Sequence, residues 1–343
     1  MNRRRFLSTI LAGSVAAFSG IGVAHAADAG FAFADKQGEH LDVLLDGKVV
    51  GRYMYAHDTS TKERAHDTYK PYLHVFDADG KAPITKGAGG QFTHHRGIYI
   101  GWNKIGFEGK SYDRWHMKGG DQIHQKFGEQ KADADSATFT SHVLWQADQP
   151  DRALINEERT ITFQKTGPGR LVIDFTSKLT APNGEVKLDG DPEHAGIHFR
   201  PADEVDKSAG VYTYPKEHAD AHKDTDYPWV GQTFTLNGKK HSVIEMSHPS
   251  NPAGTRWSAY RNYGRFGAFP TATIQKGDSL TVKYRFVIAD GEMPPVEAIQ
   301  KAYDRFAGVT TASPVPATTV KPAEGAKPAA PKTPAAKKPA ANK

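Results

Sequence analysis

Residues 280–288 read Leu-Thr-Val-Lys-Tyr-Arg-Phe-Val-Ile, so every second residue from Leu280 to Ile288 is large and apolar. Successive side chains of a β-strand point to opposite faces, and this alternation is typical of a strand with one buried face. Residues 171–175 repeat the pattern. Such half-buried strands are typical of antiparallel sheets. Similar stretches predict further strands at 41–45, 49–55, 72–76, 97–102, 137–145, 159–164, 196–200 and 242–246.

Turn signals and a single helix complete the pattern. The turn signals between strands are Asp46-Gly47, Asp79-Gly80, Asn183-Gly184 and Asn237-Gly238. One helix is predicted after Pro294-Pro295, where an apolar stripe recurs at helical spacing in Val296, Ile299, Tyr303 and Phe306. Many strands and one late helix predict an all-β fold, a large antiparallel β-sandwich of the extended kind found in galactose mutarotases and some polysaccharide lyases.

The two ends of the chain differ in composition from its body. Residues 1–26 have the form of a twin-arginine export signal, with Arg3, Arg4 and Arg5 before an apolar run and the Ala24-His25-Ala26 cleavage pattern. A short membrane anchor is the alternative. Residues 310–343 are rich in Pro, Ala and Lys, which predicts a disordered tail. We therefore expect a β-sandwich domain over 27–309 in a periplasmic or secreted protein.

The formal net charge of +5 comes from these ends. They hold nine of the 44 basic residues and one of the 39 acidic residues, so the body between them is close to neutral. A nucleic-acid partner is not expected, because such binding needs a basic folded face. The basic tail would at most tether the protein weakly to anionic envelope polymers. The sequence has no cysteine, which excludes disulfides and thiolate ligands.

Thr93-His94-His95-Arg96-Gly97 is the first candidate site, because adjacent imidazole and guanidinium groups each need a polar partner when buried. We expect His95 and Arg96 to face a ligand and His94 to orient them. A hydrogen-bonded structural turn is the alternative. Further candidate site residues lie nearby in the sequence. They are Tyr72, His74, Trp102, Trp115 and His116.

A second candidate cluster is Ile197-His198-Phe199-Arg200, where His198 and Arg200 share one face of a predicted strand. His194 precedes His198 by four residues and is close enough to reach the same site from the turn before the strand. Arginine binds a carboxylate with two parallel hydrogen bonds, and imidazole exchanges protons near neutral pH, so the pair suits an anionic or polyhydroxylated ligand.

Residues 247–252 form a predicted irregular loop, because each of its two prolines disfavours helical geometry in the residue before it. His248 and Asn251 lie in this loop, and Trp257, Arg261 and Tyr263 follow. Aromatic rings beside Arg, Asn and His are typical of sugar binding. The alternative is that these side chains close one end of the sandwich.

Six segments in this order resemble the PmoA-like family, which carries the label methane oxygenase PmoA, over roughly residues 40–291. They are residues 70–74, 79–80, 93–97, 195–200, 247–252 and 261–264. The resemblance implies the fold and the positions of the site. A membrane copper methane oxygenase needs several apolar spans of about 20 residues. The chain has none after its N-terminal segment, so that activity is excluded.

Common catalytic motifs are missing from the sequence, including G-x-S-x-G, phosphate loops, dinucleotide fingerprints and H-E-x-x-H. We expect a protein that acts on a sugar or sugar acid by acid–base chemistry, as an epimerase, lyase or hydrolase. His95 and His198 are the expected proton-handling groups, with Tyr72 as a third. Arg96 and Arg200 would hold a carboxylate or developing negative charge.

Two other classes of function stay open. The first is a non-catalytic carbohydrate-binding protein. The second is a metal-dependent oxygenase or hydrolase with histidine ligands and a carboxylate from Asp113, Glu193 or Asp203. Under the leading hypothesis no cofactor and no membrane insertion are expected.

Overall fold

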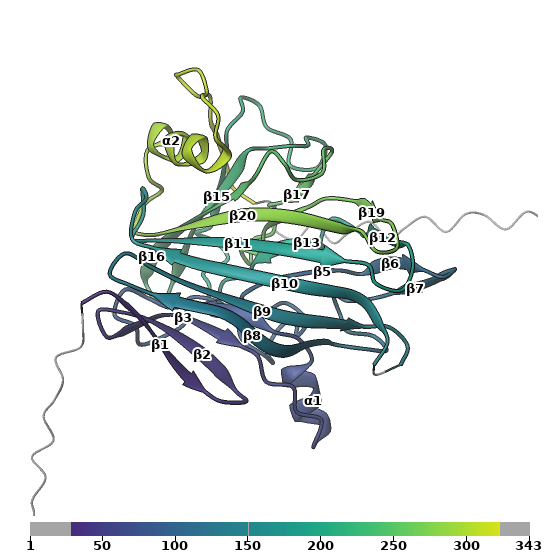
Figure 1. Ribbon diagram of the computed structural model, residues 1–343. Helices are drawn as coiled ribbons and strands as arrows, with labels where there is room; N and C mark the ends of the chain where they lie inside the picture. The colour runs from purple at the N-terminus through teal and green to yellow at the C-terminus, as the bar shows by residue number, and fades with distance from the viewer. Residues whose placement is uncertain (1–28, 150, 323–343) are drawn as a thin grey trace, which may run out of the picture.

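The computed structural model of the protein describes residues 29–149 and 151–322 (Figure 1). The predicted export signal lies outside the described residues, as does the part of the predicted tail after residue 322. Neither helix in the described part of the chain combines the length and the hydropathy needed to cross a membrane.

The chain folds into antiparallel sheets, which confirms the predicted all-β class. A six-stranded sheet has the order β1 (Phe31–Lys36), β2 (His40–Leu45), β3 (Lys48–Met54), β4 (Tyr72–Val75), β5 (Ile98–Trp102) and β13 (Ala195–Phe199). A nine-stranded sheet has the order β21 (Thr318–Val320), β14 (Val211–Tyr214), β15 (Trp229–Leu236), β16 (Lys239–Ser247), β20 (Ser279–Asp290), β11 (Leu171–Thr180), β10 (Ala153–Gln164), β9 (Ser136–Gln146) and β8 (Gln122–Ala132).

Two smaller sheets were not predicted. One has the order β19 (Ala272–Ile274), β12 (Val186–Asp189), β6 (Lys104–Phe107) and β7 (Lys110–Tyr112), and the other pairs β17 (Arg256–Ser258) with β18 (Gly267–Phe269). Their strands have three or four residues, which is too short for an alternating pattern to stand out.

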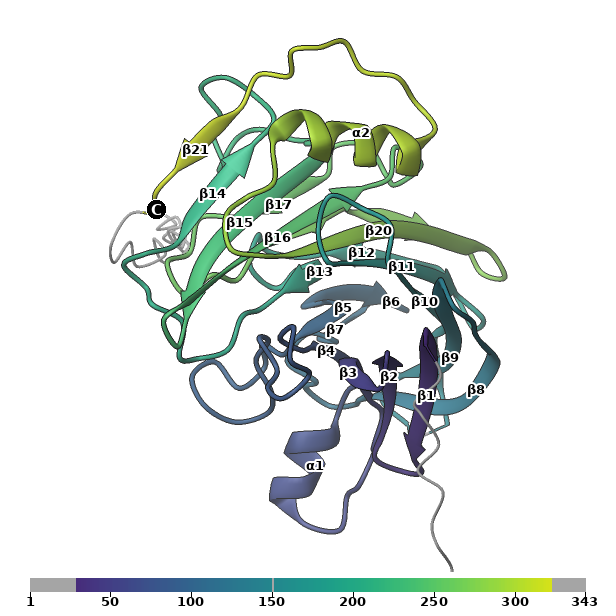
Figure 2. The same cartoon turned by 90° about the vertical axis from the view of Figure 1, so that its left-hand side faces the viewer.

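One continuous core lies between the two large sheets, which face each other with the long strands β8 to β11 curving around the six-stranded sheet (Figure 2). The alternation from residue 280 to 288 lies within β20. Its apolar residues Val282, Tyr284, Phe286 and Ile288 are all fully buried in this core. The pattern was predictive because burial of one sheet face selects an apolar residue at every second position.

The predicted helix is α2 (Val296–Ala307), which begins after Pro295 and ends at Gly308, a residue with the positive φ that glycine tolerates best. Its buried Ile299 and Tyr303 pack on Trp229 and neighbouring residues on the outer face of the nine-stranded sheet. A second helix, α1 (Lys62–Thr68), was not predicted, because it is short, largely polar and depends on the Thr61 N-cap.

Two predicted turns have the expected hairpin geometry. Both residues of Asp46-Gly47 and of Asn237-Gly238 have positive φ, as a two-residue turn of type I′ requires. The predicted start of the tail needs a correction, because residues 318–320 form the edge strand β21, which pairs with β14. The segment 310–322 contains no aromatic residue, and its three-residue strand gives too weak a pattern to be recognised in the sequence.

A buried polar network links the two large sheets. Arg159 and Glu157 form a fully buried ion pair at 2.8 Å in β10, and Arg159 also donates to the carbonyl of Pro71, just before β4. Breaking a buried pair by removing one partner costs about 3–5 kcal/mol, because the other charge stays buried. The network thus fixes the start of β4 against the opposite sheet, close to Lys70.

Candidate functional site

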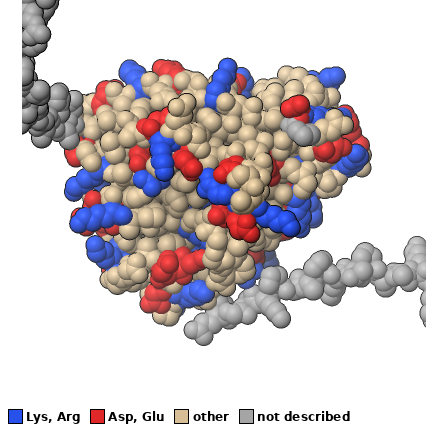
Figure 3. Space-filling model, turned by 90° about the horizontal axis from the view of Figure 1, so that it is seen from below, with Lys and Arg blue, Asp and Glu red and all other residues tan. Residues whose placement is uncertain are grey.

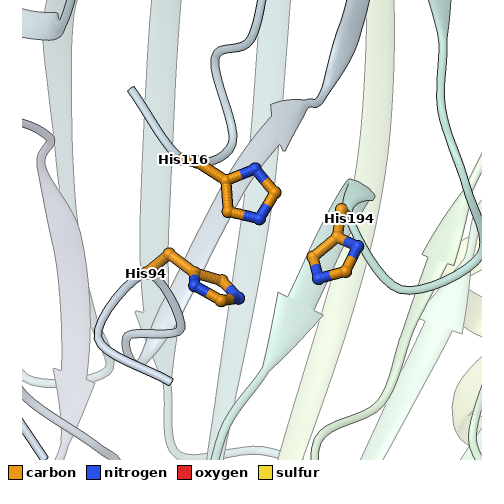
Figure 4. A group of neighbouring side chains, drawn as sticks. All are labelled: His94, His116 and His194. Carbon is orange, nitrogen blue, oxygen red and sulfur yellow. The ribbon is translucent and has the colours of Figure 1, made fainter. Parts of the chain in front are cut away.

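Three histidines from three different loops meet beside β5 and β13 of the six-stranded sheet (Figure 4). His94 lies just before β5, His116 follows β7, and His194 lies just before β13. One ring nitrogen from each lies within 4.8 Å of the others, and all three side chains are half-buried. Three imidazoles at this spacing can share one metal ion.

Two of these imidazoles are oriented by carboxylates. Nδ1 of His116 lies 2.8 Å from Oδ2 of Asp113, and Nδ1 of His194 lies 2.8 Å from Oδ1 of Asp191. A carboxylate accepts hydrogen bonds, so the proton of each ring is on Nδ1 and the lone pair on Nε2 is free. Carboxylates in this position are typical of histidines that bind a metal through Nε2.

The loops that carry these pairs are themselves held rigidly. Asp113 Oδ1 accepts the backbone N–H groups of Trp115 and His116, at 3.0 and 2.8 Å. The guanidinium of Arg114 is fully buried and donates to five backbone carbonyls around the same loop. Asn103 donates to Asp191 at 2.5 Å in the other loop. The two imidazoles are therefore fixed before any ligand binds.

The buried Lys70 fixes the third histidine. Its Nζ donates to the carbonyls of His94 and Trp115, at 2.7 and 2.8 Å, and lies 3.6 Å from the ring centroid of Tyr99. Lys70 thereby ties the His94 loop to the His116 loop. Burial, together with the charge of Lys70, lowers the pKa of His94 to about 2. The imidazole is neutral at physiological pH, as a metal ligand must be.

Glycines allow the close backbone packing on either side of these loops. A Cβ on Gly97 would lie 2.1 Å from the carbonyl oxygen of Leu73, and a Cβ on Gly196 would lie 2.1 Å from that of Ala268. Both residues also have positive φ. Only glycine fits these two positions without moving the backbone.

A buried polar layer lies beneath the three histidines. The rings of His95 and His198 are 5.5 Å apart, and both contact Trp115, at 6.1 and 4.9 Å between centroids. Both ring nitrogens of His95, Nδ1 of His198 and Nε1 of Trp115 are buried without a hydrogen-bond partner. Burial and the charge of Arg265 hold the pKa of each histidine well below its usual value. Buried polar atoms are rarely left unpaired in proteins, so several here in one place indicate a ligand site.

Five predicted site residues meet in this cluster: His94, His95, His194, His198 and Tyr263. The Tyr263 ring stacks on His95 at 6.2 Å. The two candidate clusters, the 93–97 segment and the His198 strand, therefore meet in one place. Arg261 lies nearby in an ion pair with Glu193, next to His194.

The two arginines predicted to hold a carboxylate are engaged elsewhere. Arg96 is buried, and its guanidinium donates to the carbonyls of His66, Asp67 and Thr93, so it joins α1 to the His94 loop. Arg200 donates to two backbone carbonyls and to Asp203 at 2.6 Å. These backbone partners could not be predicted from the sequence, because they come from residues that only the fold brings near the two arginines.

Four predicted binding residues are not part of the cluster. Trp102 shares the core-facing side of β5 with Ile98 and Ile100, and its indole donates to the carbonyl of Pro270. Trp257 is also buried in the main core. Two residues lie in the loop after β16, where His248 packs on Phe306 of α2 and Asn251 bonds Ser247 and Lys283.

Tyr72 and His74 lie at the edge of the cluster. Tyr72 packs with Tyr99 and Trp115, and burial raises its pKa, which disfavours the phenolate as a base. His74 bonds Thr85 at 3.0 Å, and burial lowers its pKa to about 4. Neither residue belongs to the group of three histidines.

Two residues of the candidate site were missed from the sequence. They are His116, as a candidate ligand, and Asp191, which orients His194. The signal was a repeated Asp-x-x-His pattern, present at 113–116 and again at 191–194. Of the carboxylates considered for a metal, Asp113 orients His116, whereas Glu193 and Asp203 pair with arginines.

Residues 40–304 match the model of a family of unknown function (DUF6807), and the chain belongs to this family. No curated protein matched the sequence.

The solved structures similar to this chain include three carbohydrate enzymes or their homologues. A heparan sulfate lyase HepC mutant from Pedobacter heparinus has a TM-score of 0.39 at 9% identity, over 77% of this chain and 37% of that chain. A GalM/aldose epimerase homologue from C. elegans has a TM-score of 0.35 at 10% identity, over 77% of this chain and 100% of that chain. Galactose 1-epimerase from Lactobacillus acidophilus NCFM has a TM-score of 0.36 at 9% identity, over 76% of this chain and 98% of that chain.

Proposed function

We propose that the protein is a metal-dependent enzyme in which His94, His116 and His194 bind one divalent metal ion through Nε2. The observation that carries the proposal is the pair of carboxylate-oriented imidazoles, His116 with Asp113 and His194 with Asp191, facing the unpaired buried Nε2 of His94. Imidazole ligands suit Zn²⁺, Fe²⁺, Ni²⁺ and Cu²⁺. Zn²⁺ is the first candidate, since three histidines and an open fourth position form a common catalytic zinc site.

The reaction class follows from the ligand set. Three neutral ligands leave the full charge of the metal to polarise a substrate oxygen or to lower the pKa of a bound water to about 7. His116 and His194 are partly exposed, at 22% and 26%, so substrate and water can reach the ligating nitrogens. The protein supplies a rigid ligand set and the buried His95 and His198 beside it. This arrangement suits hydrolysis, or proton abstraction next to a polarised carbonyl.

The proposed substrate is a sugar or sugar acid. The unpaired nitrogens of His95 include one donor and one acceptor, and two hydroxyl groups of a sugar could bond them, one at each nitrogen. The ring of Tyr263 beside His95 offers an apolar face to sugar C–H groups. Export to the periplasm stays part of the proposal.

Metal analysis tests the proposal directly. Protein purified without chelators should contain about one equivalent of a transition metal, measured by inductively coupled plasma mass spectrometry. The variant His116→Ala should lose it, while His248→Ala, which lies outside the cluster, should keep it. Metal-free protein that also fails to take up Zn²⁺, Fe²⁺, Ni²⁺ or Cu²⁺ on titration would exclude the metal centre.

A further inference from the structure

Arg265 lies next to the buried layer of the site but takes no part in the ligand set described above. Phe266 bridges Phe199 in an antiparallel pair, so Arg265 lies on the same side of this pairing as His198. Its guanidinium carbon is 5.4 Å from the ring centroid of Trp115, the indole that also contacts His95 and His198. The positive charge thus lies against the same indole as the two buried imidazoles.

The charge of Arg265 is not satisfied by the protein. The side chain is fully buried, and Nη1 donates to the hydroxyl of Ser258. Nε and Nη2 have no partner. Among the residues that the structure describes, no carboxylate forms an ion pair with Arg265. Leaving a charged donor buried and unpaired is costly, so this arrangement is typical of a group that receives an anionic ligand.

Glu245 is a further buried ionisable group that lacks a full set of partners. It is also fully buried, and its Oε1 accepts the backbone N–H of Ala268 at 3.1 Å. Its Oε2 has no partner. The two groups therefore stay apart even though each lacks a partner, which leaves the Nε and Nη2 edge of Arg265 open.

This guanidinium differs from the other arginines near the site. Arg96 and Arg114 donate to backbone carbonyls, and Arg200 pairs with Asp203. The Nε and Nη2 atoms form one edge of the planar guanidinium, and this edge matches the two oxygens of a carboxylate.

We propose that Arg265 binds the carboxylate of an acidic sugar whose hydroxyl groups reach His95 and the metal-ligating histidines, so that the substrate class is a uronic acid rather than a neutral sugar. This inference rests on the site under the proposed function but not on the identity of the metal. The carboxylate would accept two parallel hydrogen bonds from the Arg265 guanidinium. Folding has already removed water from this guanidinium, so binding does not have to desolvate it.

Isothermal titration of the full-length protein with glucuronate, its methyl ester and glucose tests the inference. Glucuronate should bind at least about tenfold more tightly than either neutral sugar. Arg265→Met should weaken glucuronate binding about 10- to 100-fold, the range for losing charge-assisted hydrogen bonds, and leave glucose binding and metal content unchanged. Its thermal midpoint should stay equal or rise, because a buried unpaired charge is removed.

Arg256→Met is the matched control, since this arginine also lies over an aromatic ring, Phe269, but is exposed to solvent. It should bind glucuronate like the unmodified protein. Equal binding of glucuronate and its ester overturns the inference without any variant, even if Arg265→Met does not fold. Unchanged glucuronate affinity of Arg265→Met also overturns the inference. Binding of inorganic phosphate without binding of glucuronate overturns it as well. Uronate binding that depends on Arg265 in a protein without metal would support the inference and refute the metal centre.

Discussion

Replacing Lys70 by methionine should weaken metal binding although Lys70 is not a ligand. The Nζ group of Lys70 holds the carbonyl of His94 at 2.7 Å and that of Trp115, the residue before His116, at 2.8 Å. Methionine has a similar length but no donor. The substitution releases the two loops that carry two of the three ligands.

The size of the effect follows from the two carbonyls that lose their partner. Each buried unpaired carbonyl costs about 1–3 kcal/mol, and removal of the buried amine offsets part of this, so we expect a net loss of about 2–4 kcal/mol in the free energy of unfolding. For a domain of this size that lowers the thermal midpoint by about 4–8 °C. Loss of groups that position ligands typically lowers metal affinity about 10- to 100-fold.

Competition for Zn²⁺ with a chromophoric chelator measures the affinity, and calorimetry measures the midpoint. Ile173→Ala is the control, because Ile173 in β11 is fully buried in the main core, so its truncation lowers stability by a similar amount without touching a ligand loop. It should lower the midpoint and leave Zn²⁺ affinity unchanged. If Lys70→Met loses stability but binds Zn²⁺ like the unmodified protein, the residue is structural only and the positioning argument is wrong.

Two further predictions concern single carboxylates. Asp113→Asn should lower Zn²⁺ affinity about 10- to 100-fold in the same chelator assay, because an amide that donates to Nδ1 of His116 moves the ring proton to Nε2; unchanged affinity would show that the tautomer does not matter. Burial holds the pKa of Glu245 well above its usual value, so the folded state keeps this proton and loses stability as the pH rises above about 4.3. The midpoint of Glu245→Gln, relative to the unmodified protein, should therefore rise between pH 4.5 and 8 in calorimetry, and a constant difference would contradict the raised pKa.

The surface charge agrees with the composition of the body of the chain. Figure 3 shows one face of the molecule, on which basic and acidic side chains of the described residues are interspersed. Binding of a small anion would therefore depend on the buried Arg265 rather than on a charged field over this face.

Most large elements of the fold could be predicted from local sequence. The alternation in β20 and β11, the two turns of type I′ and the stripe of α2 each follow from chemistry within about ten residues. The short strands and α1 could not be predicted, because three to seven residues contain too few positions to establish a period.

The sequence alone determined that the chain is a β-sheet protein and that polar groups near residues 94–95 and 194–198 need partners. Only the tertiary structure decided which groups meet. His116 joins His94 and His194 because three loops come together beside β5 and β13. In the proposed site Arg265 takes the role expected of Arg96, because the Arg96 guanidinium donates to backbone carbonyls. The alternation of apolar and polar residues shows that neighbouring side chains of a strand face opposite sides of the sheet. It does not show which residues of other strands and loops those side chains contact. That depends on strand order and register, which contacts between residues far apart in the chain determine.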